Sequence, residues 1–245
     1  VYDLNEKRSA EVNDELKELL EFSLKMQEDT NGYFNPFIGR LSHLWKDALS
    51  KGELLEESIV LEEKTIMEET SLKIEGNHIE LIGNGNVDLG GVAKGYATSK
   101  VKEYLDSVEC TRYMLDAGAS NILLGNKNGA TFKIGFSKAI ENGYFCTLSV
   151  KEKAIGTSSI REQKCLIDGK YYSHLLNPKT GYPATNYETL SIFGQDSKEL
   201  DVYSTACFSM EVEELVEFLD SRELDYVVSK DNQLFLKSRG VEQYE

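Results

Sequence analysis

Two adjacent glycines stand between a strand-like and a helix-like segment in residues 86–97, and they constrain the fold more than any other feature of the chain. Gly90 and Gly91 lack a Cβ, so the backbone can turn there and approach a ligand closely. A helix that begins near Val92 would direct its free N–H groups and its positive end at an anion, and Lys94 would add a full charge. An ordinary strand-to-helix turn with a surface lysine fits the same residues. The stretch predicts this turn and leaves anion binding open.

Two common nucleotide-binding motifs do not match this stretch. The Walker motif places Ser or Thr after its lysine, whereas Gly95 follows Lys94. Gly83, Gly85 and Asp88 do not complete the G-x-G-x-x-G pattern. These two standard nucleotide loops are therefore excluded.

Length and charge limit the classes of protein to which the chain can belong. Its 245 residues, 40% of them hydrophobic, can bury a sizeable core, and we expect one domain over residues 1–245. The 27 Lys and Arg against 42 Asp and Glu leave a net charge of −15, which argues against a nucleic-acid partner. An anionic ligand would therefore need a locally positive site, built from a metal ion and a lysine.

The cysteines and the apolar runs carry no strong signal. Cys110, Cys146, Cys165 and Cys207 form no C-x-x-C pair, so we expect buried free thiols rather than a zinc or thioredoxin-type site. No apolar run approaches the roughly 20 residues of a membrane span. Because the chain starts at Val1 without a signal peptide, we expect the gene product to extend upstream.

Periodicity predicts an α+β fold, in which mixed sheets pack against helices. Helical spacing occurs in residues 10–28, 38–49, 53–70, 92–107 and 200–210. Strands are expected in a hairpin over 72–82, in a strand-turn-strand over 113–124, and at 132–136, 144–150, 154–157, 164–167, 171–176, 226–228 and 234–236. Tyr33, Phe34 and Trp45 are expected in the core, and His78 is interpreted as structural.

Four stretches carry residues suited to chemistry. His174 ends a strand before a loop shaped by Pro and Gly, where an imidazole could act as a general base, although a lone histidine is often structural. Asp201 and Thr205 share a helical face and offer the oxygen ligands that Mg²⁺ prefers, unless Asp201 is simply an acid at a helix N-terminus. Asn121 follows small residues that either leave room for a ligand or make a tight bend. Residues 154–159 could hold phosphate oxygens or form a Ser/Thr turn.

Taken together and in this order, these stretches resemble the ApbE-type FAD:protein FMN transferases over about residues 30–210. The resemblance rests on T-N-G-Y-F-N-P at 30–36 with L-x-x-L-W at 41–45, the stretch 86–97, G-A-S-N at 118–121, A-I-G-T-S-S at 154–159, S-H-L-L-N-P-K-T-G-Y-P at 173–183 and D-V-Y-S-T at 201–205. Ser159 replaces the usual glycine, and Asn177 replaces the common aspartate.

The resemblance implies a T-fold-like α+β domain that lacks its N-terminal strand and helix. It implies Mg²⁺-dependent transfer of the FMN moiety of FAD to a Ser or Thr hydroxyl of a partner protein, with release of AMP. His174 would be the general base. The cofactor-binding residues would be Asp88, Lys94, Asn121, Thr157, Ser158 and Leu175, and the metal ligands would be Gly91 through its carbonyl, Asp201, Ser204 and Thr205.

Two alternatives stay open at this point: a Mg²⁺-dependent FAD pyrophosphatase that yields FMN and AMP, and an FAD-binding protein without turnover. By resemblance we expect a place outside the cytoplasmic membrane, tethered by an N-terminal lipid or signal segment. The four cysteines, which show no pairing pattern, favour a reducing cytoplasmic compartment instead.

Overall fold

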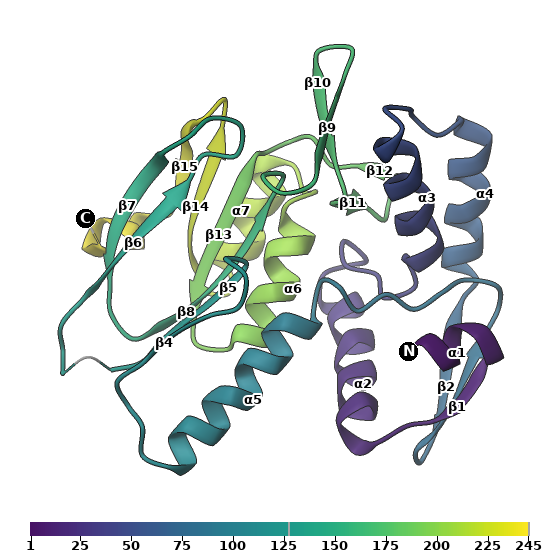
Figure 1. Cartoon of the computed structure of the whole chain (residues 1–245), viewed down its shortest axis with the longest axis horizontal. Helices are drawn as coiled ribbons and strands as arrows, with labels where there is room; N and C mark the ends of the chain where they lie inside the picture. Colours follow the sequence, from purple (N-terminus) through teal and green to yellow (C-terminus); the bar gives the residue numbers. More distant parts are fainter. Residues whose placement is uncertain (127, 245) are drawn as a thin grey trace. The chain divides into compact units, whose positions relative to one another are not determined.

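The computed structural model describes residues 1–126 and 128–244 and shows two compact units (Figure 1). Unit 1 consists of Val1–Gly90 and Lys164–Pro183, and unit 2 consists of Gly91–Gln163 and Ala184–Glu245. The chain therefore leaves unit 1 at the Gly90–Gly91 pair that the sequence singled out. The units mix helices with antiparallel sheets, which confirms the predicted α+β class, whereas the single domain stays a prediction.

Unit 1 combines helices with short antiparallel strands. Within the described residues its three-stranded sheet has the order β1-β3-β2, and the predicted hairpin over 72–82 is confirmed as β2 and β3. Its elements are α1 (Tyr2–Lys7), β1 (Ser9–Glu11), α2 (Asp14–Asp29), α3 (Gly39–Ser50), α4 (Glu57–Glu68), β2 (Ser71–Glu75), β3 (His78–Ile82), the hairpin β9 (Lys164–Ile167) and β10 (Lys170–Ser173), and the pair β11 (Leu176–Asn177) and β12 (Tyr182–Pro183).

Side chains set the helix start and the packing in unit 1. Asn13 caps α2 because its side chain accepts a hydrogen bond from the backbone of Leu16. Trp45, which is 1% exposed, packs with other buried side chains of α3 and α4 and donates its indole N–H to the carbonyl of Gly181 at 2.8 Å. This bond fixes the loop between β11 and β12 against α3.

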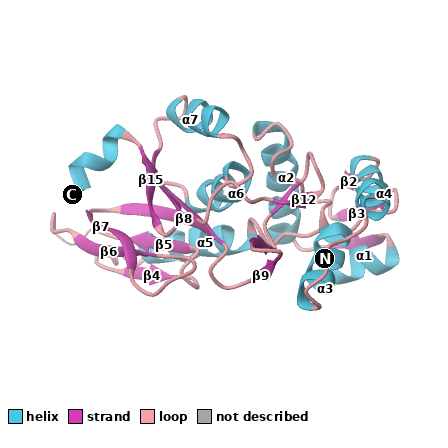
Figure 2. Ribbon diagram, turned by 90° about the horizontal axis from the view of Figure 1, so that it is seen from above, coloured by secondary structure: helices cyan, strands magenta, loops and turns pink. Residues whose placement is uncertain are grey.

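Unit 2 is built on an antiparallel sheet that has six strands in the described residues, in the order β15-β14-β13-β8-β5-β4. Its elements are α5 (Ala93–Ser107), β4 (Met114–Asp116), β5 (Asn121–Leu124), the hairpin β6 (Phe132–Ser137) and β7 (Tyr144–Val150), β8 (Lys153–Ser159), β13 (Thr189–Gly194), α6 (Ser197–Cys207), α7 (Val212–Asp220), β14 (Asp225–Lys230), β15 (Gln233–Lys237) and the 3₁₀ helix η1 (Arg239–Tyr244). The helix η1 contacts β7 and β14. Figure 2 shows the C-terminal end of the chain near β7.

The sheet of unit 2 packs against the hairpin and against α6. Ile155 of β8 and Phe193 of β13 are paired across the sheet and join a cluster with Phe136 and Leu148 of the hairpin. Helix α6 packs on β8, β13 and β5. Because alternate residues of a strand point to opposite faces, β8 supplies one set of side chains to the hairpin and the other set to α6.

Several sequence-based expectations need correction. The central strand β13 was not predicted, although all six of its residues are buried, and neither were α1 and β1. The strand predicted at 154–157 is confirmed as part of β8, which continues to Ser159 in place of the Ser/Thr turn, and α6 begins at Ser197 rather than near residue 200. Of the four cysteines, which are free thiols in the described structure, only Cys207 is buried. No described helix is both long and apolar enough to cross a membrane.

Candidate functional site

Helices α5 and α6 of unit 2 lie close together because glycine stands at their contact. A Cβ on Gly95 would overlap the backbone carbonyl of Ser197 and the Cβ of Asp201. The Ser197 hydroxyl also donates a hydrogen bond to the Gly95 carbonyl at 3.1 Å. A larger residue at position 95 would therefore push the two helices apart.

This contact places the Asp201 carboxylate at the N-terminus of α5. Asp201 is 3% exposed, and its Oδ2 accepts a hydrogen bond from the backbone N–H of Gly95 at 2.8 Å. Val92, the residue before α5, provides no capping side chain within the described structure, so Asp201 takes that role from a neighbouring helix. Asp201 does not stand at the N-terminus of its own helix. That place belongs to Asp196, whose side chain caps α6 by accepting a hydrogen bond from the Lys198 N–H.

Burial determines the electrostatics of this carboxylate. Removal from water raises the pKa of Asp201 above its ordinary value, while the Gly95 N–H, the charge of Lys94 and the nearby Asn121 amide oppose that rise. Lys94 lies in the first turn of α5, as the sequence predicted. A bound cation would therefore stabilise the ionised carboxylate, because it would replace part of the hydration that burial removes.

Asn121 is the least satisfied polar side chain beside Asp201. It is fully buried, and neither its Nδ2 nor its Oδ1 has a hydrogen-bond partner of ordinary geometry among the described residues. Asn121 pairs with Gly156 across β5 and β8, where a Cβ on Gly156 would overlap the backbone of Leu200 in α6. The Asn121 side chain therefore points to the α6 side of the sheet, where an unsatisfied amide is costly unless a ligand binds it.

The hydroxyl groups of β8 and α6 divide between two environments. Ser158 donates to the Ser204 hydroxyl at 3.1 Å, and Ser204 and Thr205 donate to the Asp201 main-chain carbonyl at 3.0 and 3.1 Å. The Thr157 hydroxyl instead lies 2.8 Å from that of Ser191 in the adjacent strand. Ser158 thus faces the Asp201 cluster, whereas Thr157 points to the other face of the sheet.

Asp88 lies in unit 1, in the loop that follows β3. Its backbone N–H donates to the Pro36 carbonyl at 2.8 Å, and its Oδ1 accepts from the Gly90 N–H at 2.7 Å. Pro36 belongs to the T-N-G-Y-F-N-P stretch, so two motifs that are distant in sequence meet here. The carboxylate of Asp88 shapes the turn into Gly90 and is only half-buried.

His174 also belongs to unit 1, where it is exposed between β10 and β11. The buried Ser173 precedes it, and the half-buried Leu175 follows, with its N–H donating to the Ser173 hydroxyl at 3.3 Å. The next turn is closed by Asn177, whose Oδ1 accepts from the Lys179 N–H at 2.9 Å. An aspartate could accept the same bond, so the exchange to Asn177 keeps this turn.

Aromatic contacts tie the His174 motif to the N-terminal motif within unit 1. The ammonium group of Lys179 lies 3.7 Å from the centroid of the Tyr33 ring. The rings of Trp45 and Tyr182 are 5.8 Å apart between centroids. Phe34 and Trp45 are buried, as predicted, whereas Tyr33 is half-buried and lies under Lys179.

The predicted site residues therefore fall into two groups. Asp88, His174 and Leu175 belong to unit 1, and the others belong to unit 2. In unit 2, Lys94, Asn121, Ser158, Asp201, Ser204 and Thr205 gather at the contact of α5, α6 and the sheet, and Gly91 precedes α5. The sequence reasoning missed Gly95 and Gly156, which allow this contact; their only signal was glycine within predicted regular structure.

The atoms of this cluster that could coordinate a metal are oxygen atoms, and only one of the groups that carry them, Asp201, is a carboxylate. No group of three or more His, Cys, Asp or Glu comes together in residues 1–126 and 128–244. A zinc-type site is therefore not indicated there, whereas one carboxylate, hydroxyls and a carbonyl are the donors that hard cations such as Mg²⁺ accept.

Known proteins share both the sequence pattern and the fold. A family model described as the ApbE family matches residues 1–228. The FAD:protein FMN transferase of Treponema pallidum is 28% identical over 217 residues, which cover 80% of this chain and 60% of that protein. A protein with the same name from Klebsiella pneumoniae is 29% identical over 157 residues, which cover 62% and 48%. The chain thus spans about half to three fifths of these relatives.

Solved structures show the same fold. The ApbE protein of Thermotoga maritima superposes with a TM-score of 0.88 at 23% identity, covering 100% of this chain and 82% of that one. The flavin transferase ApbE from Vibrio cholerae gives a TM-score of 0.77 at 22% identity, covering 96% and 78%. The family model covers nearly the whole chain, and these folds agree with it. The chain therefore belongs to the ApbE family.

Proposed function

We propose that the protein transfers the FMN moiety of FAD to a Ser or Thr hydroxyl of a partner protein and releases AMP, with Mg²⁺ as the metal. The observation that carries the proposal is the buried cluster in unit 2, where Asp201 and the unsatisfied amide of Asn121 lie at the N-terminus of α5 beside Lys94. Such a place suits a cation and a phosphate together. The relatives named FAD:protein FMN transferase support this choice.

The residues present fit a magnesium ion. The Asp201 carboxylate would supply the negative charge, and Thr205 and the carbonyl of Gly91 would supply neutral oxygen donors. Ser204 already accepts a hydrogen bond from Ser158 and donates another, so its oxygen keeps one lone pair for a ligand. When bound, the ion would offset the negative charge that develops on the pyrophosphate of FAD.

The reaction needs positioning and charge neutralisation more than covalent help from the protein. The acceptor hydroxyl attacks the phosphorus attached to the riboflavin side, the bond from that phosphorus to the AMP phosphate breaks, and AMP leaves. His174 takes the proton of the hydroxyl. Lys94 and the N–H groups of α5 hold phosphate oxygens, while Asp88 and Leu175 contact FAD.

The first experiment mixes the protein with FAD, Mg²⁺ and a candidate flavin-carrier domain, measures AMP and records intact masses of both proteins. Equal amounts of AMP and of an FMN-sized mass gain on the carrier would support the transferase. AMP with free FMN in the absence of a carrier would establish the FAD pyrophosphatase instead. Bound but uncleaved FAD across a panel of carriers would establish a binding protein without turnover.

The role of His174 is tested by His174→Ala. General-base catalysis typically contributes roughly 10² to 10⁴-fold, so we expect transfer to fall by that factor while FAD binding persists. His78→Ala is the matched control, because His78 is also exposed in unit 1 and its Nδ1 lies 2.9 Å from Glu11. Unchanged turnover in His174→Ala would remove His174 from the mechanism.

We also propose that the full-length protein works outside the cytoplasmic membrane, attached by an N-terminal lipid or signal segment. The family resemblance supports this location. Fractionation of cells that produce the complete gene product tests it, with protease added to intact cells or spheroplasts. Protection from the protease until the membrane is broken would place the enzyme in the cytoplasm instead.

A further inference from the structure

The loop that leads to Asp88 is fastened by the N-terminal segment of the chain. Asn5 of α1 donates its Nδ2 to the Val87 carbonyl at 2.9 Å and accepts the Val87 N–H on its Oδ1 at 2.8 Å. One side chain thus satisfies both backbone groups of the residue before Asp88, 82 positions away in sequence. Val87 is 3% exposed, so these bonds lie where water does not compete freely.

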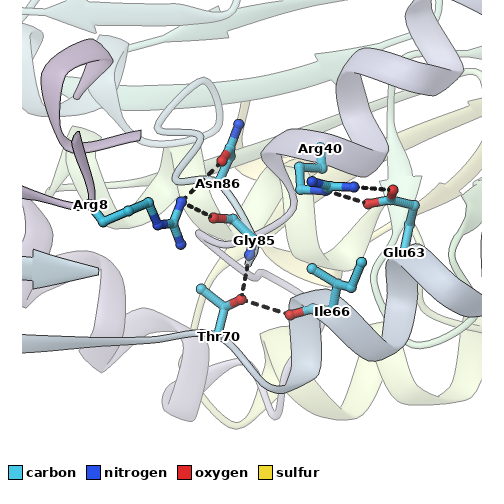
Figure 3. A network of polar contacts seen from close by, with 7 residues as sticks. All are labelled: Arg8, Arg40, Glu63, Ile66, Thr70, Gly85 and Asn86. Atoms are coloured by element: carbon cyan, nitrogen blue, oxygen red, sulfur yellow. Dashed lines mark hydrogen bonds and ion pairs between the residues drawn. The ribbon is translucent and has the colours of Figure 1, made fainter. Parts of the chain in front are cut away.

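Arg8 holds the first half of the same loop. Its guanidinium donates from one nitrogen to the Gly83 carbonyl at 2.6 Å and from the other to the Gly85 carbonyl at 2.8 Å. Figure 3 shows the guanidinium directed at Gly85 and at the side-chain oxygen of Asn86. Arg8 reaches this position because it ends α1 in the left-handed conformation, with φ 62°. A planar guanidinium can bridge two carbonyls in this way, whereas an ammonium group cannot match its fork.

The opposite side of the loop is closed by Thr70, which lies between α4 and β2, and by Gly39 at the start of α3. The Gly85 N–H donates to the Thr70 hydroxyl at 2.8 Å, and Thr70 donates to the Ile66 carbonyl (Figure 3). The Gly39 N–H donates to the Asn86 carbonyl at 3.0 Å. A Cβ on Gly85 would overlap Thr70, so the loop has little freedom to shift away from Arg8. Residues 83–87 are therefore held by α1 and its C-cap, by α3 and by the connection between α4 and β2.

We propose that Asn5 and Arg8 are positioning residues, which hold residues 83–87 so that Asp88 is presented to FAD in one conformation. The inference rests on the proposed function, in which Asp88 contacts FAD. Ordering a flexible loop on binding costs backbone entropy, so a loop that is ordered before FAD arrives makes FAD binding tighter.

The test is a double-mutant cycle on FAD affinity, measured by flavin fluorescence or calorimetry rather than by turnover. We expect Asn5→Ala and Asp88→Ala each to weaken FAD binding about tenfold, the size of a typical lost hydrogen bond in a polar site. If Asn5 acts through Asp88, the double variant binds no more than about twofold more weakly than Asp88→Ala. Additive losses, of about a hundredfold, would overturn the inference, and so would unchanged affinity in either single variant.

Two comparisons separate positioning from simple loss of stability. Asn77→Ala removes another side-chain amide of unit 1, which bonds Asp14 rather than the loop, and is expected to leave FAD affinity unchanged. Arg8→Lys keeps the charge but loses the fork, so we expect weaker FAD binding there as well, with turnover at saturating FAD close to that of the unchanged protein. Equal loss in Asn77→Ala would show a general effect on unit 1 and overturn the inference.

The melting temperature of each variant is measured in parallel. FAD titrations are performed about 10 °C or more below that temperature, so that every variant is folded during the titration. Alanine favours helix more than asparagine, so Asn5→Ala does not weaken α1 itself. If the unchanged protein failed to bind FAD, the proposed function would fail together with this inference. If it binds FAD but the cycle is additive, only the inference fails.

Discussion

The Asp201 cluster of unit 2 and the Asp88 loop of unit 1 are stabilised in opposite ways. In unit 2, Gly95 and Gly156 let backbones approach until a Cβ would overlap α6, and the carboxylate is buried between them. In unit 1, side chains reach across the fold to backbone groups, as Asn5 does to Val87 and Trp45 does to Gly181. The first arrangement depends on two positions without a Cβ, whereas the second depends on long-range side-chain donors and acceptors.

The largest effect on stability is expected where a backbone would be displaced in unit 2. Gly156→Ala places a Cβ against the carbonyl of Leu200, so we expect a loss of about 2 to 3 kcal/mol of unfolding free energy. Gly194→Ala in the next strand is the control, because its Cβ would meet only the flexible side-chain ends of Leu200 and Leu224. Thermal unfolding of both variants measures the difference. Equal losses would show that strand propensity, rather than the approach of α6, determines the cost.

The corresponding change in unit 1 removes one donor without adding volume. Trp45→Phe leaves the Gly181 carbonyl without its indole partner, and we expect a loss of about 1 to 2 kcal/mol, measured by urea unfolding with circular dichroism. Tyr182→Phe keeps the ring 5.8 Å from Trp45 and serves as the control. A negligible loss in Trp45→Phe would mean that packing alone holds the loop after His174.

The smallest effect, and one of opposite sign, is expected at Asp201. Burial raises the folded-state pKa of Asp201 above its unfolded value, so stability is lost as the pH rises from the unfolded pKa through the folded pKa. Asp201→Asn keeps an acceptor for the Gly95 N–H without the charge, so the metal-free variant is expected to be at least as stable as the unchanged protein at pH 8. This advantage should shrink as the pH falls below the folded pKa and vanish below the unfolded pKa, where Asp201 is protonated in both states.

The same variant separates stability from ligand binding. We expect Mg²⁺ with FAD to raise the melting temperature of the unchanged protein and to have no such effect on Asp201→Asn. Asp47→Asn, on an exposed ion pair with Lys51, is the control for loss of a carboxylate. A strongly destabilised Asp201→Asn at pH 8 would show that the charged cap of α5 outweighs its desolvation cost.

The sequence by itself determined the α+β class, most element positions and the motifs that carry Asp88, His174 and Asp201. These features are local, because hydrophobic periodicity and turn residues act over a few positions. The strand β13 was not predicted because both of its faces are buried. Its sequence therefore lacks the alternation of apolar and polar residues that identifies a half-exposed strand. The strand predicted at 154–157 extends to Ser159 instead of ending in a Ser/Thr turn, because pairing with β13 overrides the preference of Ser and Thr.

Only the tertiary structure decided which of the candidate groups lie together. It separated Thr157 from Ser158 through strand alternation and placed Asp201 at the N-terminus of α5. It also brought Asn5 and Arg8 to a loop more than 70 positions away. Such long-range bonds leave no periodic trace in the sequence, because one donor and one carbonyl suffice and almost any residue supplies the carbonyl. Their position depends on the packing of whole elements, which spacing along the chain does not record.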